Sequence, residues 1–175
     1  MNQLFDNMLR AAKLDSAFYE KVEADTSMLG QAMLVVVLSS VAAGIGSIGQ
    51  TGIGGIIFMT IIALIGWYVW AWLTYLIGTR LLPEPQTKAD MGELLRTIGF
   101  SSAPGVLRIL GIIPGLNTIV SWVAAIWMLV AMVVAVRQAL DYSSTGRAIA
   151  VCAIGWIIQM IILIVLVGFF MAGAR

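Results

Sequence analysis

The feature that most constrains this chain is an apolar run over residues 148–171. The run holds fourteen Ile, Leu, Val and Phe residues, and Gln159 is the polar side chain that opposes them. On insertion scales these residues together favour transfer of a helix into a bilayer by roughly 4–8 kcal/mol. About twenty helical residues cover the hydrocarbon thickness, and each backbone group must find its partner inside the segment. The run therefore predicts a transmembrane α-helix.

Four further apolar segments precede this run, at 28–45, 56–77, 93–113 and 118–136. Across the chain 61% of residues are hydrophobic and 11% are charged, whereas soluble domains are about half apolar and about a quarter charged. A body of 175 residues has too much surface for its volume to bury that excess. We therefore expect an all-α integral membrane protein, with five transmembrane helices forming one domain over 28–171.

The connections between these segments are polar or rich in glycine. Residues 44–55 contain six glycines, and residues 79–92 contain Pro83 and Pro85, so both stretches predict loops. The segment 93–113 is the least regular span, because Pro104 should kink its helix. A four-span alternative, in which 93–113 lies on the cytoplasmic side, stays open.

Residues 1–27 have a different character and carry much of the charge. Apolar residues recur at helical spacing, and charged residues fill much of the opposite face, which predicts an amphipathic helix on the bilayer surface or against the rest of the protein. Five acids outnumber three bases here, so the segment is not a signal peptide.

The distribution of bases predicts the orientation. With five spans, one side and its helix ends hold Arg10, Lys13, Lys21, Arg80, Lys88, Arg96, Arg137 and Arg147. The other side holds Arg108 and Arg175. An excess of eight bases over two marks the cytoplasmic side. We expect residues 1–27 in the cytoplasm and the C-terminus outside.

Two polar side chains fall within apolar segments and are candidate contacts to a partner or a lipid. Arg108 costs about 2.5–3.5 kcal/mol at the centre of a span, so it either contacts a substrate or headgroup, or extends to phosphates at the outer surface. Gln159 either bridges two helices by a hydrogen bond or lines a polar path. Of these readings, extension to the surface and a single hydrogen bond are the simpler ones.

Four further candidates lie at helix ends on the cytoplasmic side. Glu93 and Arg96 are three residues apart on one helical face, which predicts a weak local pair at the entry of the third span. Arg137 and Asp141 are four residues apart, which predicts local pairing where the fourth span ends. At either place the alternative is a contact to a partner.

Little reactive chemistry is visible in the chain. There is no histidine, and the single cysteine, Cys152, lies in an apolar run where a packing role is expected. No nucleophile with a base and no phosphate-binding loop is present, so we expect no catalytic, metal or cofactor site and no enzyme. A net charge of +1 argues against nucleic acid as a partner.

Three blocks of sequence resemble a known family. They are Ala24-Asp25-Thr26 leading into Gly30-Gln31-Ala32-Met33-Leu34-Val35-Val36, then Leu95 to Gly105, then Ile126 to Val130 followed by Val136 to Leu140. These blocks resemble bacterial members of the Yip family (Ypt-interacting protein domain), in matching order and spacing over most of residues 20–170. The resemblance implies a five-span domain with a cytoplasmic N-terminus, and it favours a bacterial inner (cytoplasmic) membrane. Eukaryotic relatives are linked to small prenylated GTPases and vesicle traffic, and that partner is not carried over to this chain.

Three functions follow as hypotheses. The first is a structural or accessory subunit that binds other membrane proteins, or itself, within the lipid bilayer. The second is a small permease, channel or lipid-handling protein, for which Arg108 and Gln159 are the motive. The third is a membrane-shaping or trafficking-like protein, for which the amphipathic segment is the motive.

Overall fold

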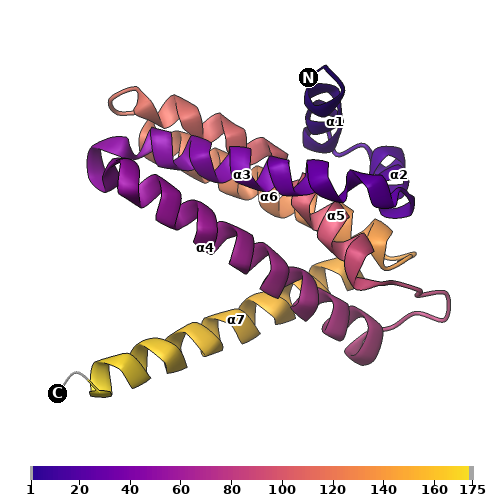
Figure 1. Ribbon diagram of the computed structural model, residues 1–175. Helices are drawn as coiled ribbons and strands as arrows, with labels where there is room; N and C mark the ends of the chain where they lie inside the picture. Colours follow the sequence, from indigo (N-terminus) through magenta and orange to yellow (C-terminus); the bar gives the residue numbers. More distant parts are fainter. Residues whose placement is uncertain (1, 174–175) are drawn as a thin grey trace.

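The computed structural model describes residues 2–173, with the side chains of residues 2, 49–51, 163 and 166–173 excepted. Within that range every regular element is a helix. Figure 1 shows long helices that run back and forth through one bundle. The first two helices of the chain are short and lie toward one end of this bundle. Arg175, which was expected on the outer side, lies outside the described residues.

The amphipathic segment is two helices and not one. Helix α1 spans Asn2–Ala12 and α2 spans Ser16–Ala24. Between them Leu14 takes a positive φ of 61°, and the Asp15 side chain accepts a hydrogen bond from the N–H of Phe18. A left-handed residue followed by an N-cap ends one helix and begins the next, so the single continuous helix expected over this stretch was wrong.

The next two helices form an antiparallel pair (Figure 1). A short 3₁₀ turn, η1 (Thr26–Met28), leads into α3 (Leu29–Gly46), and α4 covers Ile48–Leu76. The glycine-rich loop expected at 44–55 is therefore mostly helical. The chain reverses near Ser47, and Gly52, with φ 63°, kinks the start of α4. Helix α4 then passes into a π-helical turn, η2 (Ile77–Leu81).

The irregular third segment is two helices in series. Helix α5 (Met91–Ser101) ends where the 3₁₀ helix η3 (Ala103–Ile112) begins. Pro104, in the first turn of η3, has no N–H to donate, so the α-helical pattern stops just before it. The kink expected at Pro104 is thus a change of helix type. Ser101 satisfies a freed backbone group by donating from its hydroxyl to Ile98 O at 2.7 Å.

Small residues let α5 and η3 lie directly against α3. Ala32, Ser39 and Gly46 of α3 face Gly99, Gly105 and the backbone of Arg108, in that order. A Cβ on Gly46 would meet the carbonyl oxygen of Arg108 at 2.1 Å. Close backbone contact of this kind requires small side chains on both helices. It holds α5 and η3 along the length of α3, with α6 on another side.

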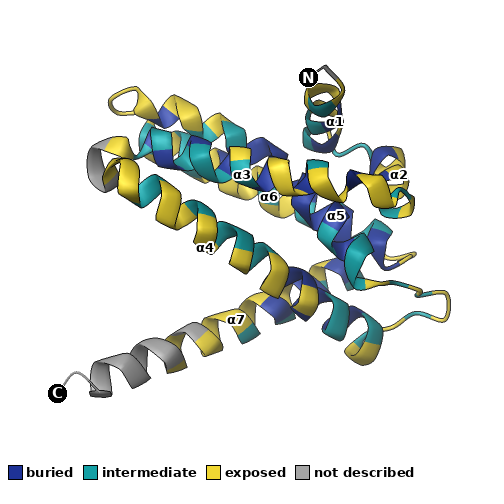
Figure 2. Ribbon diagram, in the orientation of Figure 1, coloured by how far each residue is buried: buried dark blue, intermediate teal, exposed yellow. Residues whose placement is uncertain are grey.

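The last two helices complete the bundle. Helix α6 spans Asn117–Ala139 and buries a row of alanines, Ala124, Ala131, Ala135 and Ala139. Helix α7 spans Thr145–Gly173 and packs on the bundle only near its beginning, after which it diverges from α4 (Figure 1). Figure 2 shows the change from buried to exposed along α7.

The exposed surface of the long helices is apolar, which is the reverse of a soluble protein. Isoleucines 53, 57, 61, 62 and 65 of α4, for example, are all exposed. Among the described residues, four helical segments are long and apolar enough to cross a membrane: Thr26–Gly46, Gly52–Leu81, Asn117–Ala139 and Thr145–Ile162. A surface of this kind is stable in contact with lipid, so the chain is an integral membrane protein.

Candidate functional site

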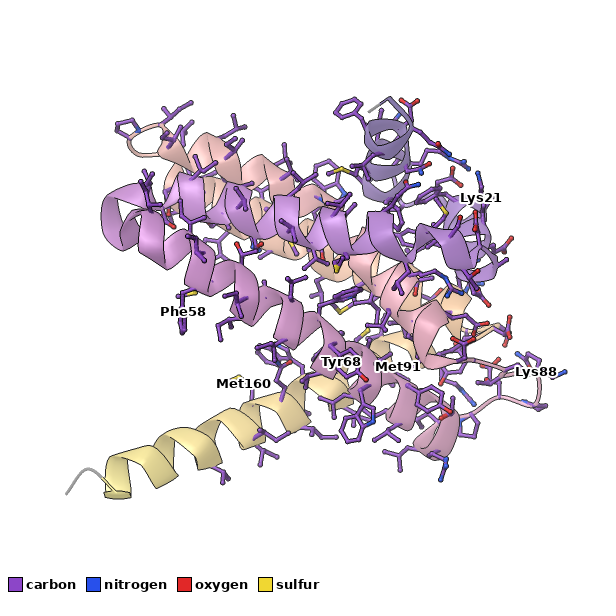
Figure 3. All side chains as sticks on the ribbon, in the orientation of Figure 1. Lys21, Phe58, Tyr68, Lys88, Met91 and Met160 are labelled. Atoms are coloured by element: carbon purple, nitrogen blue, oxygen red, sulfur yellow. The ribbon has the colours of Figure 1, made fainter. Side chains whose placement is uncertain are left out.

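Charged side chains gather at one end of the bundle. This polar end comprises α1, α2, the loop at 82–90, the start of α5 and the turn after α6. Lys21 and Lys88, far apart in sequence, both lie there in Figure 3. Among the described residues, Arg108 is the charged side chain that lies away from this end, in η3.

An open cleft of about 810 Å³ lies at the polar end. Three acids line it, Glu20 and Glu23 from α2 and Asp141 from the turn after α6. Lys88 and Arg137 contribute positive charge, and Gln86, Gln138, Tyr142, Ala24 and Pro85 complete the lining. The cleft thus presents both signs of charge from three separate parts of the chain.

Arg96 attaches α2, which contributes one wall of the cleft, to the bundle. The side chain is 4% exposed, and its Nε donates to the carbonyl oxygen of Val22 at 2.9 Å. Its Nη2 donates to the carbonyl oxygen of Glu23. These carbonyls belong to the last turn of α2, which lacks partners within the helix and carries partial negative charge. Apolar packing also joins α2 to α5, because the Phe18 and Phe100 rings pack edge to face with centroids 5.2 Å apart.

The opposite wall is held by bonds between two loops. Gln86 donates its side-chain N–H to Asp141 O at 3.0 Å. Glu84 accepts from both the N–H and the hydroxyl of Ser143, at 2.9 and 2.8 Å. The Tyr142 hydroxyl lies 2.7 Å from Leu82 O and 3.1 Å from Gly78 O. The cleft is therefore a built feature in which both sides are fixed by specific contacts.

Electrostatics inside the cleft favour a cation. Partial burial, and then repulsion from Asp141, Glu93 and Glu20, raises the pKa of Glu23 to about 7. The Glu23 carboxyl therefore loses its proton only near neutral pH. A positive group beside it would favour its ionised form. By contrast, the hydrogen bonds from Ser143 lower the pKa of Glu84, which stays ionised.

The polar end holds four of the six residues that the sequence marked as candidates, but neither expected local pair forms. Glu93 accepts from the N–H of Asp90 at 2.8 Å while Asp90 accepts from the N–H of Glu93, which is a capping box. Arg96 is occupied by α2. The Arg137 guanidinium binds Tyr142 O, Thr145 Oγ1 and Ser143 O, whereas Asp141 accepts from Lys88 N. In each pair the backbone offered nearer partners than the opposite charge.

The other two candidates lie elsewhere. Arg108 is half-buried, and within the described part of the chain no hydrogen-bond or ion-pair partner meets its guanidinium. It lies near a hollow formed by Gly46, Ser47, Ile48, residues 111–115 and Asn117. Gln159 lies on α7 and is exposed. The structure does not bring either residue to the cleft.

Glu20, Glu23 and Lys88 belong to the cleft and were missed as site residues. On the sequence they look like ordinary charges of an amphipathic helix and a loop, and only the fold brings them beside Asp141. One signal was available, because Glu20 and Glu23 lie three apart on one face of α2. No group of His, Cys, Asp and Glu able to hold a metal ion occurs among the described residues.

Comparison with known proteins supplies the family. The model of the Yip1 domain matches residues 14–167, which is most of the chain. Searches of the curated proteins and of the solved structures found no match. The matched range includes α2, the long helices and both loops of the cleft. Together with the apolar helices, this match shows that the chain belongs to the Yip1 domain family of membrane proteins.

Proposed function

We propose that the protein is a non-catalytic, five-span membrane protein that acts as a structural or accessory subunit and binds other membrane proteins through the cleft at its polar end. The observation that carries this proposal is the cleft itself, which is fixed on both sides by cross-helix hydrogen bonds. The apolar helices place this surface beside a bilayer, where a membrane partner would meet it.

Five crossings are supported by the path of α5 and η3. An α-helix of 11 residues followed by a 3₁₀ helix of 10 residues extends about 36 Å if the two are collinear, enough to cover the hydrocarbon. Their beginning lies beside α2 through Arg96, and their end lies beside Gly46, where the side-chain Nδ2 of Asn117 donates to Gly46 O at 2.7 Å. Irregular backbone is tolerated at membrane depth where protein surrounds it, and α3 and α6 flank this segment.

The charge distribution supports a cytoplasmic polar end, and the resemblance to bacterial members of the family supports a membrane of the bacterial inner type. The orientation of α1 supports a position of this helix at the bilayer surface. Helix α1 runs crosswise to α3 (Figure 1), and it exposes Phe5 and Leu9. Asn7 and Trp127 attach α1 to the bundle, through bonds to Gln31 Oε1 at 2.9 Å and to Ala12 O at 2.7 Å. An amphipathic helix fixed in this way can contact headgroups with its apolar face.

The test is a purification in mild detergent from the native membrane, with Glu23→Gln and Asp141→Asn as variants. Asparagine tolerates the positive φ of 53° at position 141, so the backbone is retained. We expect a second membrane protein to co-purify with the wild type and to be reduced in both variants. Asp6→Asn, an exposed charge on α1 outside the cleft, is the matched control. Equal recovery of the partner from all variants would contradict binding at the cleft.

Arg108 supports a second candidate, a lipid-handling role. Its guanidinium has no partner among the described residues, and it lies near the opposite end of the bundle, within reach of headgroup phosphates. If lipid handling is the function, Arg108→Ala lowers lipid binding or flux and Arg108→Lys retains part of it. If both variants match the wild type, Arg108 does no more than reach the surface.

A further inference from the structure

Gln159 is the middle residue of α7, which spans Thr145–Gly173. It lies about 21 Å along the helix axis from Thr145, so it falls near the bilayer centre when α7 crosses the membrane. Its side chain is exposed, and no residue in the described part of the chain bonds to it. An amide in hydrocarbon favours a hydrogen-bond partner on another helix. No such partner lies among the side chains that the structure describes.

Gln159 continues the row of residues by which α7 packs on its own bundle. The row is Ala148, Cys152, Gly155, Gln159 and Ile162, with alternating spacings of four and three. Ala148, Cys152 and Gly155 are buried, and Gly155 lies against the Trp70 ring. Gln159 and Ile162 are exposed, because α7 has diverged from α4 by that point (Figures 1 and 2).

A 4–3 spacing is the pattern by which helices pack side by side at a small crossing angle. Three of the five residues in the row are buried within the chain, and the other two, Gln159 and Ile162, form the exposed part that we call the free half. Trp156, 63% exposed, lies three residues before Gln159 on the same face, and a large aromatic side chain is a common anchor in helix contacts. The free half therefore has both an apolar surface and a polar group at its centre.

We propose that the free half of α7 is an interface to α7 of a second copy of this chain, with the two Gln159 amides bonded to each other. The argument for a second copy is complementarity. A glutamine amide both donates and accepts, so an identical amide satisfies both of its functions. Two copies inserted in the same direction and related by a twofold axis along the bilayer normal carry Gln159 at the same depth.

Two other polar side chains of the long helices, Ser40 and Thr60, are already engaged. Ser40 donates to Val37 O at 2.9 Å and lies 3.3 Å from Thr60 Oγ1, and Thr60 donates to Ile56 O at 2.8 Å. Ser39 is buried against Gly105. Gln159 of the second copy is an exposed amide without a partner among the described residues, and it lies at the same depth. The inference depends on α7 crossing the bilayer, but it does not depend on the cleft.

Cysteine cross-linking in native membranes tests the contact face. In the full chain carrying Cys152→Ala, we expect oxidative cross-linking at Trp156→Cys, Gln159→Cys and Ile162→Cys. Ile157→Cys and Ile161→Cys are matched controls, since both are exposed and lie on the opposite face of α7. Cross-linking that is stronger at the two control positions, or absent at all five, would overturn the proposal.

A second measurement tests the amide itself, by comparing the dimer fraction of Gln159→Leu and Gln159→Asn in reconstituted bilayers. Leucine favours insertion, so loss of fold is not expected, and the dimer should weaken by about 3- to 30-fold. Asparagine keeps the amide and should retain most of the dimer. A leucine variant that associates like the wild type, or a wild type that is monomeric, would contradict a Gln159 contact. Glu23→Gln should leave the dimer unchanged, so failure here is distinct from failure of binding at the cleft.

Discussion

Replacing Arg96 by alanine should detach α2 from the bundle. The guanidinium donates to Val22 O and Glu23 O, and the side chain is almost fully buried between α2 and α5. Alanine leaves both carbonyls without their donor and leaves a gap where the arginine stem packed. The bundle of α3 to α7 has its own contacts and should stay folded.

The size of the effect follows from the two bonds. A hydrogen bond from a charged donor contributes about 1.5–3 kcal/mol, but water can reach the carbonyls once α2 loosens, so we expect a loss of about 3 kcal/mol in the free energy that holds α2 in place. This corresponds to about a hundredfold increase in the detached population. Arg96→Lys offers one ammonium in place of a planar fork and should give an intermediate loss.

Two assays separate local from global loss. Limited proteolysis in mild detergent should cut Arg96→Ala faster within residues 13–28 and leave the remainder intact. Reactivity of the buried thiol of Cys152, the one cysteine of the chain, reports unfolding of the bundle and should change little. Arg80→Ala is the control, because Arg80 is an exposed arginine at the same end. If Arg96→Ala and Arg80→Ala are cut at the same rate, Arg96 does not hold α2.

Three further predictions test the packing and the cleft. Gly46→Val should cost about 1–3 kcal/mol or more in thermal unfolding, because its side chain meets the backbone of Arg108, whereas Gly66→Ala, with open space around it, should change stability by less than about 1 kcal/mol. In the folded protein Glu23 keeps its proton up to a pH of about 7, whereas in the unfolded chain it does so only up to about 4.3. The free energy of unfolding should therefore fall by about 1 kcal/mol as the pH rises between these values. Glu23→Gln should make the free energy of unfolding less dependent on pH in this range. Tyr142→Phe removes the hydroxyl that bonds Leu82 O and should lower stability by about 1 kcal/mol, and an unchanged melting temperature would contradict a role for that bond.

Hydropathy predicted the helices well where packing is simple. The ranges 118–136 and 148–171 correspond to α6 and α7, because long apolar runs in a bilayer can form only helices. Composition misled at 44–55. Glycines there indicate a loop in water, but in this fold they allow a tight reversal at Ser47 and close contact of Gly46 with η3.

Local sequence also could not reveal the partners of charged groups. Glu93 and Arg96 are correctly spaced for a pair, yet Asp90 N lies nearer to Glu93, and the unsatisfied end of α2 attracts Arg96. The two backbone carbonyl groups that Arg96 contacts lie 73 and 74 residues away in the chain, so the local sequence does not identify them. The cleft has the same origin, because its acids come from two elements that only the fold brings together.

The most direct test of the account is the side of the membrane on which each loop lies. In full-length protein carrying Cys152→Ala, Ile113→Cys and Ser144→Cys are labelled with a membrane-impermeant maleimide in intact and then permeabilised cells. Both positions are exposed, and they lie before and after α6. Five crossings predict that position 113 is labelled in intact cells and position 144 only after permeabilisation. The reverse pattern would contradict the account, because it would place α5 and η3 on the cytoplasmic side and the turn after α6 outside.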